Sequence, residues 1–117
     1  MNLESIRKYC FSLKGVEEDM PFDDITLVFK VMGKIFVLTD TEGELSINLK
    51  CDPGKAIELR ASYPAVQPGY HMNKAHWNTV YCDGSIDDEL IYEWIKHSYN
   101  MVVNKLPAKL REELKNL

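Results

Sequence analysis

The sequence predicts an α+β domain, a two-layer sandwich with helices on one face of a mainly antiparallel sheet. Its 117 residues, 45% of them hydrophobic, match the size of one domain with its own core. Apolar residues recur with helical spacing near both ends of the chain and with a period of two from Ile25 to Lys50. We expect the order α-β-β-β-α-β-α-α and a single domain over residues 1–117.

The first expected element is an amphipathic helix that Asn2 caps. Apolar residues from Leu3 to Leu13 recur at spacings of three and four, and Gly15 follows as a stop signal. The next segment, residues 16–24, is acidic and contains a proline. We interpret it as a solvated loop rather than a calcium site, because it lacks the ligand alternation of an EF-hand.

Three antiparallel strands are expected next. Residues 26–31 and 34–39 are rich in β-branched and aromatic side chains, and Met32-Gly33 between them indicates a tight hairpin. Residues 44–50 alternate strictly between polar and apolar types. This alternation predicts a meander with one apolar face and one face exposed to water.

A second helix is predicted to begin at Asp52-Pro53, where an acidic cap precedes a proline at the first helical position. It continues to about Ser62. Residues 63–74 contain two prolines and a glycine and are expected to be irregular. A fourth strand is predicted over residues 77–82.

The last third of the chain is expected to be helical. The segment Ser85–Asp88 has the form of a capping box, with Asp in place of the usual Glu. Apolar residues from Ile86 to Val103 then form one stripe. Leu106-Pro107 interrupts the pattern, and a short final helix is predicted over residues 108–114.

Charge and cysteine content narrow the classes of function. Fourteen basic and eighteen acidic side chains give a net charge of −4, which argues against a general polyanion binder. The chain has an odd number of cysteines, and they are widely spaced: Cys10, Cys51 and Cys82. This pattern is typical of a protein whose thiols are reduced. The start resembles no signal peptide, and no apolar run is long enough to span a bilayer. We therefore expect a cytoplasmic protein without membrane contact.

Two strings in the middle of the chain carry a family resemblance: residues 47–53, INLKCDP, and residues 68–80, PGYHMNKAHWNTV. With Pro21-Phe22 and His97-Ser98-Tyr99 they resemble the MmcQ/YjbR family of small bacterial proteins, over nearly the whole chain. The resemblance implies a compact α+β fold of the secretion-chaperone-like or frataxin-like kind. It also implies DNA binding through a "double-wing" motif.

The distribution of charge bears on this implied function. Residues 50–82 hold four basic and two acidic side chains, a local balance of +2, although the whole chain is acidic. Lysine and arginine contacts to phosphates supply most non-specific affinity for DNA, amides read base edges, and aromatic rings stack on unpaired bases. The candidate nucleic-acid or ligand residues are therefore Asn48, Lys50, Lys55, Arg60, Tyr70, His71, Asn73, Lys74, His76, Trp77 and Asn78. The alternative is that these are solvated charges around a structural loop.

No catalytic constellation accompanies these residues. The sequence has no P-loop, no GxGxxG and no nucleophile elbow, so we expect a protein that is not an enzyme and needs no cofactor. His71 and His76 lack the cysteine or acidic partners of a zinc site, so no metal is expected.

Three functions remain open at this point. The first is a DNA-binding module. The second is a protein-interaction or chaperone-like module, as a monomer or weak homodimer. The third is a protein that binds a small anionic molecule at the Gly69–Thr79 loop.

Overall fold

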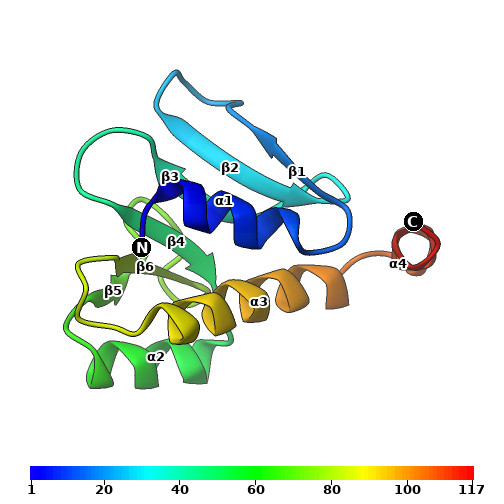
Figure 1. The fold of residues 1–117 in the computed structure, drawn as a ribbon. Coiled ribbons are helices and arrows are strands. Elements are labelled where there is room, and N and C mark those ends of the chain that lie inside the picture. Colours follow the sequence, from blue (N-terminus) through cyan, green and yellow to red (C-terminus); the bar gives the residue numbers. More distant parts are fainter.

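Helices and strands follow one another in the order α-β-β-β-β-α-β-β-α-α in the computed structural model, which describes all 117 residues (Figure 1). They form a six-stranded, wholly antiparallel sheet in the order β1-β2-β3-β4-β6-β5, which confirms the α+β class. The helices are α1 (Leu3–Phe11), α2 (Pro53–Ser62), α3 (Asp88–Asn104) and α4 (Ala108–Lys115). The strands are β1 (Val16–Asp19), β2 (Thr26–Val31), β3 (Lys34–Asp40), β4 (Ser46–Lys50), β5 (Val66–Pro68) and β6 (Trp77–Tyr81).

Two edge strands, β1 and β5, were not expected from the sequence. The predicted loop over residues 16–24 is wrong for its first four residues, because β1 pairs with β2 and places Glu17 opposite Lys30. The Nζ of Lys30 also lies 2.8 Å from a carboxylate oxygen of Asp19. An edge strand tolerates such charges since one of its sides faces solvent. β5 lies in the stretch expected to be irregular, and its Pro68 is compatible with an edge position.

The structure confirms the predicted hairpin turn and two of the predicted helix caps. Met32 and Gly33 both have positive φ, 50° and 81°, as the predicted two-residue hairpin requires. The side chain of Asn2 accepts a hydrogen bond from the backbone N–H of Ser5 and so caps α1, as expected. Asp52 caps α2 in the predicted way by accepting from the N–H of Lys55.

The capping box predicted at Ser85–Asp88 is wrong. α3 begins at Asp88, and its N-cap residue Asp87 makes no side-chain capping hydrogen bond. The hydroxyl of Ser85 instead donates to the carboxylate of Asp83 within the preceding turn. The nearer acceptor in the turn therefore competes successfully with the helix terminus for the serine.

α3 is the central helix of the domain. It packs against β2, β3 and β4, while α2 contacts β5 and β6 and α1 contacts α3 and β1 (Figure 1). Of the predicted apolar stripe, four residues of α3 are buried, Ile91, Trp94, Ile95 and Val102, and Leu90 and Val103 are half-buried, which confirms the apolar face. The core therefore lies between α3 and the middle of the sheet.

A buried serine joins α3 to the end of β4. Ser98 has no exposed surface, and its hydroxyl donates to the carbonyl of Phe36 at 2.6 Å and accepts from the N–H of Lys50 at 2.9 Å. The register between β2 and β3 shifts beside Phe36, where the β-ladder is interrupted. Ser98 thus satisfies two backbone groups that the strands leave open, and it fixes the position of Lys50.

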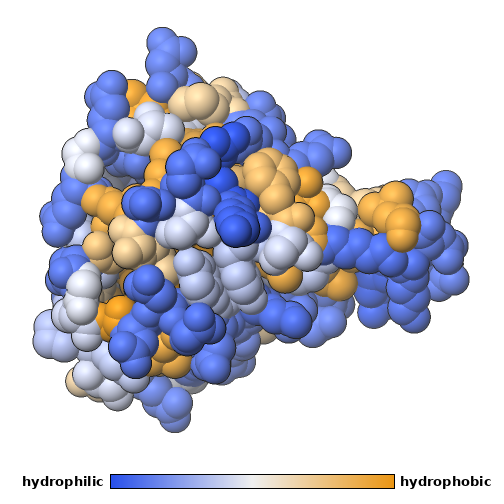
Figure 2. All heavy atoms as spheres, viewed as in Figure 1, coloured by the Kyte–Doolittle hydropathy of each residue, from blue (hydrophilic) through white to orange (hydrophobic).

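The surface is mostly polar on the face seen in Figure 2, with separate apolar patches between the polar side chains. None of the four helices combines the length and the hydropathy needed to cross a bilayer.

Candidate nucleic-acid and anion surface

The loop of residues 69–76, which joins β5 to β6, is tied down by its own polar groups. The N–H of Gly69 donates to the carbonyl of Trp77 at 2.9 Å, and the N–H of Tyr70 donates to Oγ1 of Thr79 at 3.2 Å. The ammonium of Lys74 donates to the carbonyl of Gly69 at 2.9 Å. These bonds close the loop, so the cation of Lys74 is occupied with the protein's own backbone.

Beneath the loop lies a polar contact between α2 and β6. Arg60 Nε donates to Oδ1 of Asn78 at 2.7 Å, and its guanidinium also donates to the carbonyls of Lys74 and Trp77. Asn78 is 2% exposed and donates from Nδ2 to the carbonyl of Ala56. Arg60 and Asn78 were predicted to contact nucleic acid. In the structure they support the loop, and Asn78 is too deeply buried to reach a base.

The loop presents two aromatic rings to solvent. Tyr70 is 72% exposed, and its ring centroid lies 4.0 Å from that of the exposed His71. His71 adopts a φ of +57°, a left-handed conformation that costs energy for a residue with a Cβ. Non-glycine residues in this conformation cluster at ligand sites, so the exposed pair of Tyr70 and His71 is a candidate contact surface.

The remaining loop residues divide between exposed and structural positions. Asn73 is exposed, although its Oδ1 accepts from the N–H of Ala75 and its carbonyl accepts from the N–H of His76 and of Trp77. His76 is half-buried, its carbonyl accepts from the N–H of Cys51 at 2.8 Å, and its Nδ1 is buried without a partner. The amide nitrogen of Asn73 is thus free to donate to a ligand, while His76 joins the loop to the start of α2.

Polar side chains also line β4 and β6 on the face of the sheet opposite the core. Ile47, opposite Val80, points into the core, so the alternate pair Asn48 and Thr79 lies on the other face. The hydroxyl of Thr79 donates to Oδ1 of Asn48. The next pair along the same face is Lys50 with Trp77. The predicted residues Asn48, Lys50 and Trp77 are therefore brought together beside the loop.

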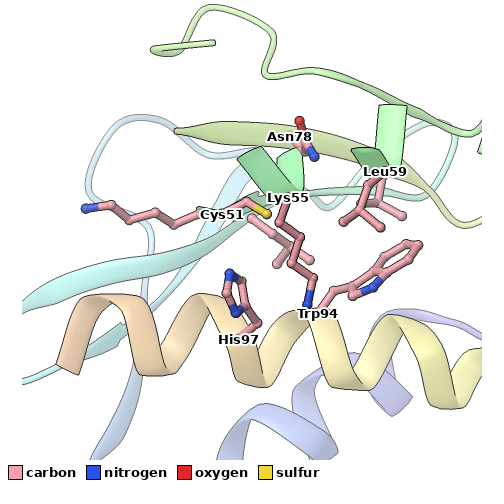
Figure 3. A pocket seen from close by; sticks show the side chains of 9 residues that line it. Cys51, Lys55, Leu59, Asn78, Trp94 and His97 are labelled. Carbon is pink, nitrogen blue, oxygen red and sulfur yellow. The ribbon is translucent and has the colours of Figure 1, made fainter. Parts of the chain in front are cut away.

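Lys50 and Lys55 line a narrow crevice between α2 and α3 with a volume of about 10 Å³, enough for about one water molecule. Figure 3 shows Lys55 descending from α2 and Trp94 and His97 rising from α3 into this space. Lys50 also lines a second pocket, together with Lys34 and Lys105. Sequence reasoning missed these last two lysines, because 16 and 55 residues respectively separate them from Lys50 along the chain.

His97 is held as an acceptor at the end of the first pocket. Its Nε2 accepts from the N–H of Asp52 at 3.3 Å, so it supports the start of α2. Burial, and secondly the nearby ammonium of Lys55, lower the pKa of His97 below its ordinary value of 6.5. The neutral imidazole is therefore the form that the fold stabilises.

This arrangement predicts a pH-dependent stability. Because the pKa of His97 is lower in the folded chain, its contribution is complete above pH 6.5 and is lost as the pH falls further. We expect the free energy of unfolding to fall from about pH 7 to about pH 5 more steeply in the wild type than in His97→Gln, which retains an acceptor but does not titrate. Urea unfolding followed by circular dichroism measures both. A constant difference between the two proteins over this range would contradict the assignment.

The cysteines have the properties of structural thiols. Burial raises the pKa of Cys10 to about 12 and that of Cys82 to about 11, and it also raises the pKa of Cys51. All three are free thiols. Thiols that remain protonated at neutral pH are poor nucleophiles, and these three side chains contribute to packing.

Fold and site together define a small α+β domain with a braced aromatic loop beside β6 and lysines that line pockets around the end of β4. The chain belongs to the YjbR family, whose family model matches residues 11–101. This confirms the resemblance seen in the sequence, and the structure shows its basis. The two strings that carry it, 47–53 and 68–80, contain most of β4 and most of β6, which are neighbours in the sheet.

Relatives that align over most or all of the chain support the same family. The chain is 36% identical to the Escherichia coli (strain K12) protein YjbR over 118 aligned residues, covering all of both proteins. It is 40% identical to Escherichia coli O157:H7 YbdF over 107 residues, which cover 91% of this chain and 88% of YbdF. The crystal structure of Deinococcus radiodurans DR2400, described as a DUF419 domain, superposes with a TM-score of 0.91 at 41% identity, covering 97% of this chain and 88% of that one.

Proposed function

We propose that this protein is a non-enzymatic nucleic-acid-binding module, with DNA as the ligand that the family resemblance names. The proposed binding surface, which we term the loop surface, consists of Lys50, Tyr70, His71 and Asn73. Lys50 contacts phosphate, the two rings stack on bases, and the amide of Asn73 hydrogen-bonds a base edge. Arg60, Lys74 and Asn78 are left out because their polar groups are used within the protein.

The observation that carries the proposal is the presentation of Tyr70. A large aromatic side chain that is 72% exposed gains little from burial within its own domain, and so its position is not explained by packing. Its backbone is nevertheless fixed through Thr79, and the neighbouring Gly69 through Trp77. Aromatic rings held in this way provide stacking platforms for unpaired bases at little entropic cost.

The register of the sheet supports including a cation of the neighbouring strand in the proposed surface. Lys50 lies opposite Trp77, and the carbonyl of Trp77 accepts from the N–H of Gly69, so the three residues form a row across β4, β6 and the loop. With strands spaced about 4.8 Å apart, the backbones of Lys50 and Gly69 are about 10 Å apart. A flexible single strand fits this combination better than a duplex, because its bases are free to stack.

Fluorescence anisotropy with an oligothymidine of about 12 nucleotides tests the proposal, with a matched abasic strand and a matched duplex as comparisons. We expect binding that weakens steeply between about 50 mM and about 200 mM salt. Tyr70→Ala should weaken binding of the thymidine strand about 5- to 150-fold, corresponding to one stacked base, and Tyr70→Phe should retain it. Binding of the abasic strand should be the same for all three proteins.

Phe22→Ala is the matched control, because Phe22 is another highly exposed aromatic, at 63%, in the β1–β2 connection. It should bind like the wild type. Lys50→Gln should lower the salt slope by about one unit. Absence of binding to every probe at about 50 mM salt would refute the proposed function.

A second candidate, a protein-interaction module, is favoured by a separate surface. Met20, Phe22 and Ile25 are exposed to 40%, 63% and 40% in the connection that follows the edge strand β1. Exposed apolar side chains beside an unpaired strand edge are typical of contact surfaces for another chain. Light scattering tests self-association through this surface, and a monomer at all concentrations would contradict it.

A further inference from the structure

The second pocket that Lys50 lines lies where β4 ends, β3 begins and α3 terminates. Three lysines from these elements, Lys34, Lys50 and Lys105, surround it, and Ile35, Val102 and Leu106 supply its apolar wall. Its volume is about 260 Å³, just below the roughly 300 Å³ at which pockets for drug-sized molecules begin, so it suits a small ligand.

The charge of this pocket is not balanced within the protein. No carboxylate lines it, and the ion pairs of the molecule involve Met1, Arg7 and Lys30 but none of the three lysines. None of their ammonium groups donates a hydrogen bond to a protein acceptor. Grouping three uncompensated positive charges is unfavourable, and it is notable in a chain with a net charge of −4.

The protein holds at least two of these charges close together. The backbone of Lys50 is fixed by Ser98, and Lys105 is the C-cap residue of α3. Burial, and secondly the charge of Lys105, lower the pKa of Lys50. The partial negative charge at the end of a helix favours Lys105 there, but it does not account for Lys34 at the hairpin or Lys50 at the end of β4.

We infer that the pocket of Lys34, Lys50 and Lys105 is a binding site for a phosphate monoester whose organic part packs against Ile35, Val102 and Leu106. A dianionic phosphate balances the clustered ammonium groups with hydrogen bonds that have charge on both partners. Lysines suit this task because each supplies a compact charge with three donors on a flexible stem. The apolar wall favours a ligand with a ring or chain over inorganic phosphate alone.

Two sources of such a phosphate share this chemistry: a free nucleotide, and the 5′-phosphorylated end of a nucleic-acid strand. The site shares Lys50 with the loop surface but does not depend on the proposed function, since a free nucleotide would fill it without any strand on the loop surface. Tyr70→Ala should therefore leave nucleotide binding unchanged, which separates the two proposals experimentally.

Isothermal titration with adenosine monophosphate, adenosine and inorganic phosphate tests the site. We expect adenosine monophosphate to bind more tightly than phosphate, and adenosine not to bind. Lys34→Gln, Lys50→Gln and Lys105→Gln should each weaken binding about tenfold, as expected for one charged hydrogen bond. Lys8→Gln removes an exposed lysine from α1, outside the pocket, and should have no effect.

A second comparison, between 5′-phosphorylated and 5′-hydroxyl oligonucleotides, distinguishes the two sources. Tighter binding of the phosphorylated strand, lost in Lys105→Gln, identifies a strand end, while equal binding of both strands with retained nucleotide binding identifies a free nucleotide. The inference is overturned if the wild type binds neither adenosine monophosphate nor a 5′-phosphate selectively. It is also overturned if all three lysine variants bind like Lys8→Gln.

Discussion

Replacing Asn78 with alanine is expected to lower the free energy of unfolding by about 2–4 kcal/mol. The change removes the acceptor of Arg60 Nε and the donor to the carbonyl of Ala56, both in a site where Asn78 is 2% exposed. Water cannot easily replace these partners, and the shorter side chain leaves a small cavity. Urea unfolding monitored by circular dichroism measures the loss.

Two further variants isolate the cause of this effect. Asn100→Ala replaces an exposed asparagine on α3 and should change stability by no more than about 0.5 kcal/mol. In a double-mutant cycle, Arg60→Ala and Asn78→Ala should show a coupling energy of about 1–3 kcal/mol, because the two side chains are hydrogen-bonded. Additive effects, or a loss in Asn78→Ala no larger than in Asn100→Ala, would show that the contact is unimportant.

Replacing Gly69 with alanine is expected to destabilise the protein by about 1–3 kcal/mol and to free the loop. A Cβ at this position would lie 2.8 Å from the Cβ of Trp77 and 3.0 Å from its carbonyl oxygen. The carbonyl belongs to the backbone of β6, so the loop must move away and lose the bond from Gly69 N–H. Hydrogen exchange should then show faster exchange at Gly69 and Tyr70 than in the wild type.

Gly54→Ala is the matched control for the glycine substitution. Its Cβ would have one neighbour, a carboxylate oxygen of Asp52 at 3.4 Å, and the position lies in the first turn of α2. Alanine there should leave stability unchanged or raise it by up to about 1 kcal/mol, because it restricts the unfolded chain. Equal stability in the two alanine variants would contradict the close packing of Gly69 on Trp77.

Several elements were predictable because their signals are local. The Met32-Gly33 turn, the Asn2 and Asp52 caps and the buried stripe of α3 depend on residues within a few positions of one another. The strand β1 was not predictable in this way. Its charged sequence is typical of a loop. Its strand conformation follows from pairing with β2 and from the ion pair between Asp19 and Lys30, both of which are tertiary contacts.

The candidate site shows the same division between local and tertiary information. The sequence singled out the segment Gly69–Thr79 and the basic middle of the chain, and its resemblance to the YjbR family is confirmed. It did not distinguish Tyr70, which is exposed, from Asn78, which is buried eight positions later. Which side chains are free for a ligand depends on their hydrogen-bond partners, and those of Asn78 come from α2, 18 and 22 residues away.

The sequence by itself thus determined the α+β class, the family and the segment richest in candidate binding residues, since composition, periodicity and short motifs carry this information. Only the tertiary structure decided how the cations are used. Arg60 and Lys74 are bound to the loop, while Lys50 joins Lys34 and Lys105 around a pocket. The physical reason is that charge acts through space. The net charge of −4 describes the whole chain, but a ligand experiences the few charges that the fold brings together and leaves unpaired.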